Sequence, residues 1–285
     1  MIISASRRTD IPAFYSDWFI NRLNAGYCLV KNPFNPTQIK RVSLLPQDVD
    51  GIVLWTKNTA LLLPKISALD PFSYYFQYSI TPYHTDIETG LANKQDVIIP
   101  AFLELASKIG AERMIWRYDP IVINNRYTYE YHIGAFTRLC ELLKGSTKKC
   151  VISFVLAYKS VAKSLREVGS IELDVAEKLL LVESLSEIAK SHEITLCACC
   201  ELPGLYELGI QPISCVDAIL LSKIAQKTLC VPRDKNQRDG CNCAVSVDIG
   251  AYNSCINGCQ YCYANHVEAR VRANYTEHDS NAEML

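Results

Sequence analysis

Strand-forming apolar runs alternate along the chain with segments of helical periodicity, and this alternation constrains the fold more than any other feature. The clearest expected strands are Met1–Ser6, Gly51–Trp55, Tyr74–Ile80, Arg113–Trp116, Cys150–Leu156 and Ile194–Cys199. Two weaker runs, Val216–Leu221 and Ala244–Ile249, follow them. Helical spacing is clearest over Val97–Lys108, Tyr129–Leu143 and Val175–Ser191. The alternation predicts parallel βα units.

The number of these units sets the expected architecture. About eight βα units close a barrel of about 250 residues, and a chain of 285 residues accommodates one. An open, doubly wound sheet is the competing architecture, but no glycine-rich phosphate loop follows the first expected strand. We therefore expect a TIM-like α/β barrel formed by a single domain, residues 1–285. Its cysteine-rich section is residues 197–262.

The charge balance argues against a broad nucleic-acid-binding surface. The chain carries 29 Lys and Arg against 30 Asp and Glu, for a net charge of −1, which gives little non-specific attraction to phosphates. Its hydrophobic content of 49% supports a large core. No apolar run reaches about 18 residues, and the N-terminal MIISASRRTDIP lacks the order of a secretory signal. We expect a cytoplasmic protein without a membrane partner.

The 13 cysteines are concentrated in the second half of the chain. In a reducing compartment, clustered thiols indicate metal binding or catalysis rather than a disulfide scaffold. Cys28, Cys140 and Cys150 stand apart in apolar surroundings, so we expect them to pack in the core.

The strongest motif is the C-x3-C-x2-C spacing of Cys255, Cys259 and Cys262, with Tyr261 before the third thiol. A short loop with this spacing wraps three corners of a [4Fe–4S] cluster and leaves one iron open to a small molecule. Gly258 suits the tight turn that such a loop makes. The alternatives are chance thiols, or a zinc site in which His266 is the fourth ligand.

A second group of thiols precedes this motif. Cys241 and Cys243 form a C-x-C pair, and Cys215 with Cys199 or Cys200 completes a set of thiolates for an auxiliary [4Fe–4S] cluster. We expect this group to form a centre distinct from the Cys255, Cys259 and Cys262 centre. Structural zinc, or buried thiols without a ligand, are the alternatives.

Charged side chains follow several expected strands. In parallel βα units the carboxyl ends of the strands open on one face, where active sites are built. The candidates for binding or catalysis there are Arg7, Arg8, Asp10, Lys57, Arg117, Asp119 and Glu201. The alternative is that they are ordinary solvated loop residues.

The three-cysteine motif resembles the cluster motif of the radical S-adenosylmethionine enzymes. The resemblance implies a [4Fe–4S] cluster whose open iron chelates S-adenosylmethionine, and reductive cleavage to a 5′-deoxyadenosyl radical. It implies that Tyr261 packs near the adenine, and that a flavodoxin or ferredoxin supplies electrons for chemistry on a small molecule or a macromolecule. Lys57 or Arg117 is expected to pair with the methionyl carboxylate.

Phrases covering nearly the whole chain resemble an uncharacterised family that carries such a motif near its C-terminal end. They are SASRRTDIP (4–12), WTKN (55–58), WRYDP (116–120), ISF (152–154), CNC (241–243) and SVDIG (246–250) with Tyr252. Radical S-adenosylmethionine barrels usually carry the cluster loop after the first strand, whereas here it follows Ala244–Ile249. We therefore expect a circularly permuted barrel in which Ala244–Ile249 lies beside Met1–Ser6.

Two other classes of function fit parts of the sequence. A zinc- or cluster-stabilised module without catalysis would bind nucleic acid through the basic runs at 7–8, 148–149 and 233–238, with Tyr residues stacking on bases. An electron-transfer protein would hold two fully ligated clusters. Metal analysis separates zinc from iron, and a fourth protein ligand on the first cluster would separate electron transfer from the enzyme.

Overall fold

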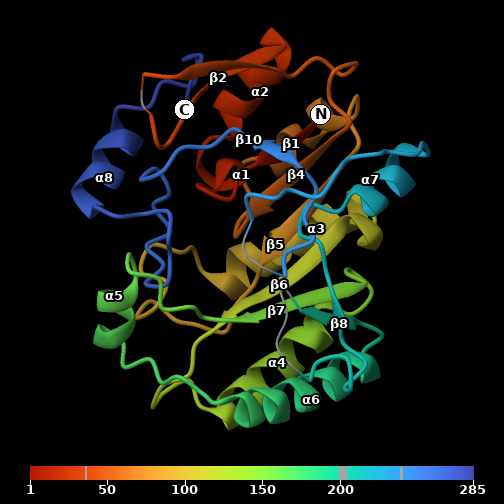
Figure 1. Ribbon diagram of the computed structural model, residues 1–285, viewed down its shortest axis with the longest axis vertical. Helices are drawn as coiled ribbons and strands as arrows, with labels where there is room; N and C mark the ends of the chain where they lie inside the picture. Colours follow the sequence, from red (N-terminus) through yellow and green to blue (C-terminus); the bar gives the residue numbers. More distant parts are fainter. Residues whose placement is uncertain (36, 199–203, 238–239) are drawn as a thin grey trace.

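The computed structural model describes residues 1–35, 37–198, 204–237 and 240–285. Its main feature is an eight-stranded parallel sheet in the order β10–β1–β4–β5–β6–β7–β8–β9 (Figure 1). The strands are β1 (Ile2–Ala5), β4 (Gly51–Thr56), β5 (Tyr74–Ser79), β6 (Met114–Ile121), β7 (Lys149–Phe154), β8 (Thr195–Ala198), β9 (Gln211–Pro212) and β10 (Ser246–Asp248). The predicted alternation of strands and helices is therefore present.

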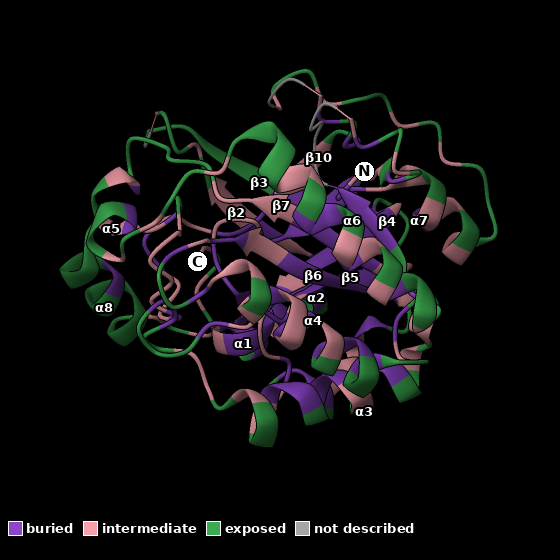
Figure 2. Ribbon diagram, turned by 90° about the horizontal axis from the view of Figure 1, so that it is seen from below, coloured by how far each residue is buried: buried purple, intermediate pink, exposed green. Residues whose placement is uncertain are grey.

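Helices that follow the early strands cover one face of the sheet. They are α2 (Ser16–Ala25), α3 (Ile99–Ile109), α4 (Tyr129–Leu143) and α6 (Val175–Ser191). Trp18, Phe102, Phe136 and Leu185, one from each helix, are fully buried in a single apolar core against the strands. The sheet and the inner sides of these helices form the buried centre of the molecule (Figure 2).

The starts of the two longest helices are set by local hydrogen bonds. The Thr128 hydroxyl accepts from the Tyr131 backbone N–H at 3.3 Å before α4. Asp174 and Glu177 form a capping box before α6, with both hydrogen bonds at 2.8 Å. Such caps satisfy backbone donors that the first helical turn leaves unpaired. The helices predicted over Tyr129–Leu143 and Val175–Ser191 have these bounds in the structure.

The opposite face of the sheet is covered by α7 (Ala218–Ala225) and by the cysteine-containing segments beside it. Leu221 from α7 packs with Cys215 and Cys243 against Val53 and Tyr75 of the strands. This is the face that a closed barrel would turn inward. Because helix and loop fill that space, strands β9 and β10 stand at opposite edges of the sheet.

The expectation of a closed, circularly permuted TIM-like barrel is therefore wrong. The sheet is open, with helices on both faces, and is Rossmann-like in that broad sense. Alternation of strand and helix is common to open and closed parallel sheets. The sequence pattern consequently predicted the βα units, but not whether the two edge strands of the sheet would pair to close a barrel.

One part of that expectation is confirmed, because β10 does lie beside β1. The two strands pair in parallel, with Ile2 opposite Ser246, Ile3 opposite Val247 and Ser4 opposite Asp248. The segment that leads to the three-cysteine motif therefore emerges next to the segment that follows β1.

The strand expected at Val216–Leu221 is wrong. Helix α7 occupies most of this segment, because the Asp217 carboxylate accepts from the backbone N–H groups of Ile219 and Leu220 at 2.9 and 3.0 Å. Such a cap starts a helix, and a short apolar run has no periodicity that distinguishes strand from helix.

The remaining elements connect the layers or lie at the margins. They are α1 (Ile11–Phe14), a hairpin of β2 (Tyr27–Lys31) and β3 (Ile39–Ser43), the 3₁₀ helices Leu63–Leu69 and Ala111–Arg113, a π-helix (Lys94–Ile98), α5 (Ala162–Glu167) and α8 (Glu268–Thr276). The described part of the chain contains no helix with the length and apolar character needed to span a bilayer.

Candidate functional site

Loops that follow the carboxyl ends of the parallel strands surround a cavity of about 1360 Å³. Most of the charged side chains singled out from the sequence line it: Arg7, Arg8, Asp10, Lys57, Arg117 and Asp119. Small-molecule sites in proteins usually measure roughly 300–1000 Å³. The cavity therefore accommodates a nucleoside-sized cofactor together with a further ligand.

The three thiols of the C-x3-C-x2-C motif lie on the loop after β10 and line this cavity. Each of Cys255, Cys259 and Cys262 is partly exposed, and none of the described cysteines is in a disulfide. Gly258 turns the chain with a φ of +64°, in the left-handed region that favours glycine. The loop thus presents three thiols to one space.

A segment after β5 forms backbone hydrogen bonds with the loop that carries Cys255, Cys259 and Cys262, called the thiol loop from here on. The Gly90 N–H donates to Asn257 O at 3.0 Å, and the Gln260 N–H donates to Ile87 O at 2.9 Å. A Cβ atom at Gly90 would lie 2.1 Å from Ile256 O, so only glycine permits this close approach. Residues 87–90 therefore act as a template for the thiol loop.

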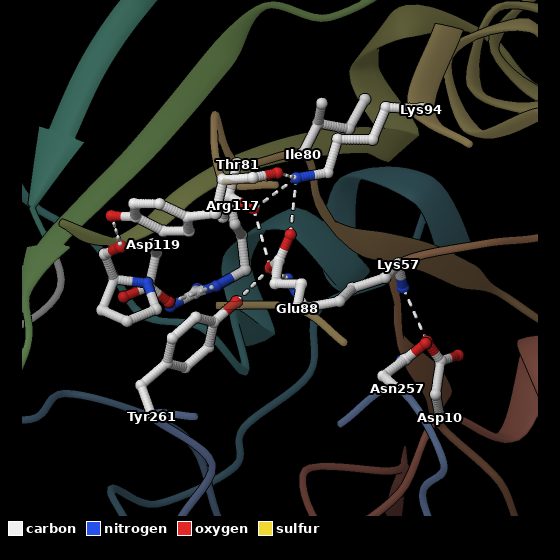
Figure 3. Close-up of polar contacts among 12 residues, drawn as sticks. Asp10, Lys57, Ile80, Thr81, Glu88, Lys94, Arg117, Asp119, Asn257 and Tyr261 are labelled. Atoms are coloured by element: carbon white, nitrogen blue, oxygen red, sulfur yellow. Dashed lines mark hydrogen bonds and ion pairs between the residues drawn. The ribbon is translucent and has the colours of Figure 1, made fainter. Parts of the chain in front are cut away.

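Glu88 is the centre of the buried charge network beside the thiols (Figure 3). Its carboxylate is 2.8 Å from Lys57 Nζ and 2.5 Å from Lys94 Nζ. It also accepts hydrogen bonds from the hydroxyls of Thr81 and Tyr261. The Glu88 side chain is only 1% exposed, so the two ammonium groups compensate a charge that water does not reach.

The electrostatics of this network favour the ionised forms of Glu88 and Lys57, whereas burial lowers the pKa of Lys94. Burial works against ionisation of Glu88, but Lys57 and Lys94 outweigh it and lower the pKa of Glu88 to about 2. Burial also works against the charge on Lys57, and Glu88 outweighs that, so the Lys57 pKa is raised. Lys57 and Tyr261 were both expected to contact a cofactor, Tyr261 by packing near the adenine. In the structure the Lys57 ammonium and the Tyr261 hydroxyl bind Glu88.

Asp10 connects the loop after β1 with the thiol loop. Its carboxylate accepts from the Lys57 backbone N–H at 2.7 Å and from Asn257 Nδ2 at 3.1 Å (Figure 3). It also accepts from the Ala13 backbone N–H at 3.1 Å. Burial raises the pKa of Asp10 to about 6, although these hydrogen bonds oppose the rise. Asp10 therefore caps α1 and fixes the position of the thiol loop.

The thiols of the motif have elevated pKa values. Burial raises the pKa of Cys259 to about 12 and raises those of Cys255 and Cys262. The metal-free loop therefore holds neutral thiols near pH 7. Binding of a soft metal centre would displace their protons, because the thiolate is the ligand.

The two arginines after β1 are fixed by Asp248 at the end of β10. The Asp248 carboxylate accepts from the Arg7 backbone N–H at 2.8 Å and from Ser4 Oγ at 3.0 Å, and it lies 4.0 Å from Arg8 Nε. A Cβ atom at Gly250 would lie 2.1 Å from Ser6 Oγ. The carboxyl ends of β1 and β10 are thus bonded together beneath the thiol loop.

Arg117 lines the cavity. Its guanidinium pairs with Asp119 at 2.5 Å and donates to Gln77 Oε1 at 3.1 Å and to Cys215 Sγ at 3.2 Å. The guanidinium groups of Arg7 and Arg117 lie 5.6 and 5.3 Å from the centre of the Trp55 ring, within the range of cation–π attraction.

The structure also brings together the second group of thiols. Cys215, Cys241 and Cys243 are buried in one cluster on the second face of the sheet and reach the same cavity. Hydrogen bonding by the Cys215 thiol outweighs burial and lowers the pKa of Cys243 to about 5. Their expected partners Cys199 and Cys200, and the candidate Glu201, lie outside the described residues.

Several residues of the site were not predicted from the sequence. Glu88 follows β5, Lys94 begins the π-helix and Asp248 ends β10, and only the fold brings their side chains to the site. No local spacing distinguishes such residues from solvated surface charges. The core assignments are confirmed, because Cys28, Cys140 and Cys150 are fully buried.

The sequence left zinc as an alternative for the first thiols, with His266 as a ligand. In the structure, the His266 ring stacks on Tyr252 at 5.9 Å between centres. Within residues 1–35, 37–198, 204–237 and 240–285, no three His, Cys, Asp or Glu side chains converge on a position for a single metal ion. A cubane cluster has a different requirement, since each thiolate binds its own iron.

Comparison with known proteins gives one family match. The model of the family described as "Domain of unknown function (DUF1848)" matches residues 2–264. This range contains every strand of the sheet and both groups of thiols. No curated protein matches the chain.

Proposed function

We propose that this protein, which belongs to the DUF1848 family, is an iron–sulfur enzyme that cleaves S-adenosylmethionine reductively. Cys255, Cys259 and Cys262 would hold a [4Fe–4S] cluster. The observation that carries the proposal is the placement of these thiols on a glycine-turned loop at the wall of a cavity of about 1360 Å³. That cavity lies at the carboxyl ends of parallel strands, where α/β proteins bind ligands.

The donor set fits such a cluster. Three thiolates are soft ligands suited to iron–sulfur centres, and three ligands for four irons leave one iron for a small molecule. Residues 87–90 and Asp10 hold the loop backbone on both sides. The loop is consequently shaped before any ligand binds, which reduces the cost of ordering it.

When bound, the cluster would supply one electron to the sulfonium, so that the C5′–S bond breaks to give methionine and a 5′-deoxyadenosyl radical. The electron comes from an external reductant of the flavodoxin or ferredoxin class. Abstraction of a hydrogen atom would convert this radical to 5′-deoxyadenosine, the product that an assay detects, and would leave a radical on the donor. The donor would be the substrate or, when no substrate is supplied, a component of the medium.

The chain's own residues would position the ligands. Arg7 and Arg117 offer positive charge to a carboxylate, such as that of methionine, at the Trp55 side of the cavity. Tyr261 is held by Glu88 with its ring beside the thiols, where it offers an aromatic surface to an adenine.

The test is anaerobic reconstitution with iron and sulfide, reduction with dithionite and incubation with S-adenosylmethionine. We expect 5′-deoxyadenosine from the wild type, and none above background from Cys255→Ala. Cys230→Ala, which removes an exposed thiol, is the matched control and should retain the activity. Equal product from Cys255→Ala and the wild type would contradict the proposal.

Metal analysis of the protein as purified anaerobically, before any iron or sulfide is added, separates the alternative of a nucleic-acid-binding module. Zinc without iron or sulfide would favour that module. Two of the basic runs proposed for that module lie at opposite ends of the parallel strands. Lys149 is at the amino end of β7, whereas Arg7 follows the carboxyl end of β1. These runs therefore do not form one continuous surface for a nucleic-acid backbone.

A further inference from the structure

The second group of thiols is assembled from segments distant in the chain. Cys215 precedes α7, whereas Cys241 and Cys243 precede β10. All three are buried, at 5%, 8% and 2% exposure, and the Cys243 thiol is hydrogen-bonded by the other two. We propose that Cys215, Cys241 and Cys243 bind a second iron–sulfur cluster, distinct from the Cys255, Cys259 and Cys262 centre.

Hydrogen-bond donors are aimed at the sulfur atoms of this group. Arg117 Nη1 donates to Cys215 Sγ at 3.2 Å, and the Val216 backbone N–H donates to Cys243 Sγ at 3.4 Å. Hydrogen bonds to ligand sulfurs orient the ligands of iron–sulfur clusters and tune their reduction potential. These two donors would orient the thiolates and tune the potential of such a centre.

The charge around these thiols also suits a cluster. Thiolate-ligated clusters carry net negative charge, and a buried charge of this kind needs compensation. Arg117 contacts Cys215 directly, and Arg7 acts on Cys243 through its positive charge. Cys28 and Cys140, by contrast, lie in the apolar core under the helices, as structural thiols do.

The second group opens on the cavity that the first thiols line. A cluster there would share the ligand space with the first centre. Arg117 contacts the second group through Cys215, and its guanidinium also lies over the Trp55 ring in the shared cavity. This inference does not rest on S-adenosylmethionine cleavage, since it concerns only what the three thiols bind.

The test counts iron and acid-labile sulfide after anaerobic reconstitution of the full chain. Relative to the wild type, Cys241→Ala with Cys243→Ala should lose about four irons. Cys230→Ala, in the same cysteine-rich section but exposed, should lose none. An unchanged iron and sulfide content in the double variant would overturn the proposal, as would zinc alone at these thiols.

A second variant tests the proposal with this group intact. Replacing Cys255, Cys259 and Cys262 together by Ala removes only the ligands of the first centre. This triple variant should produce no 5′-deoxyadenosine and should still bind about four irons with sulfide. Absence of iron from this variant, when its circular dichroism matches the wild type, would overturn the second centre while leaving the proposed activity of the first intact.

Discussion

The two groups of thiols line one cavity but are built in different ways. Cys255, Cys259 and Cys262 come from one short loop, are partly exposed, and have pKa values raised by burial. Cys215 comes from one segment and Cys241 and Cys243 from another; all three are buried, and hydrogen bonding lowers the pKa of Cys243. The first group is held through its backbone, the second through contacts to its sulfur atoms.

This difference indicates how each site resists disruption. The first loop depends on a template, residues 87–90, and on the Glu88 network behind it. The second group depends on the packing of α7 and its flanking segments against the sheet. Changes behind the thiol loop should therefore affect the first site and leave the second intact.

The largest expected effect is that of Glu88→Gln. This change leaves Lys57 and Lys94 buried without their carboxylate, and breaking a buried ion pair costs about 3–5 kcal/mol. We expect urea unfolding to show a loss of that size, and reconstitution to show loss of about four irons. Glu268→Gln, in an exposed pair with Arg272, is the control. Loss of all iron would show that the two sites are not independent.

The stability loss expected for Glu88→Gln should depend on pH, which tests whether the ionised carboxylate is its cause. Because the Glu88 pKa is about 2 when folded, below its ordinary 4.5, Glu88 contributes stability above about pH 4.5 that is lost as the pH falls toward 2. The stability difference between the metal-free wild type and Glu88→Gln should therefore narrow by about 2–3 kcal/mol over this interval. A difference that stays constant on acidification would contradict the role of the ionised carboxylate.

Gly90→Ala should have the next largest effect. Its Cβ would clash with the Ile256 carbonyl, and overpacking of this kind costs about 1–3 kcal/mol. We expect lower stability in thermal unfolding and a smaller yield of 5′-deoxyadenosine, with the iron of the second group retained. In Gly134→Ala the new Cβ has only Arg138 Nη1 nearby, at 3.9 Å, so this variant should match or exceed the wild type in stability.

Asn257→Ala should have the smallest effect. It removes the hydrogen bond from Asn257 Nδ2 to Asp10, worth about 1 kcal/mol. The folded pKa of Asp10, about 6 against an ordinary 3.8, should rise further, because that hydrogen bond lowers it. A carboxyl group whose pKa is raised by folding makes the free energy of unfolding fall as the pH rises from its unfolded to its folded pKa. In Asn257→Ala this fall should therefore extend to higher pH than in the wild type. Asn242→Ala replaces an exposed residue between Cys241 and Cys243 and is the control. It should leave the dependence of stability on pH unaltered.

The sequence predicted most strands, the long helices and the first thiol group, because each of these depends on local spacing. The helices Tyr129–Leu143 and Val175–Ser191 follow from apolar residues at a periodicity of 3.6 residues. The C-x3-C-x2-C motif needs only a loop of a few residues to present its thiols. Pairing of β10 with β1 also followed correctly, from the place of the motif after the last expected strand.

Only the tertiary structure decided whether the sheet closes and which distant side chains meet. Closure depends on what fills the second face, and here α7 and the segments with Cys215 and Cys243 fill it. Glu88 reaches the thiol loop because a backbone segment after β5 pairs with it, a contact that spans much of the chain. Periodicity and spacing describe residues that are neighbours in the chain, whereas closure and buried charge pairing depend on residues that only folding brings together.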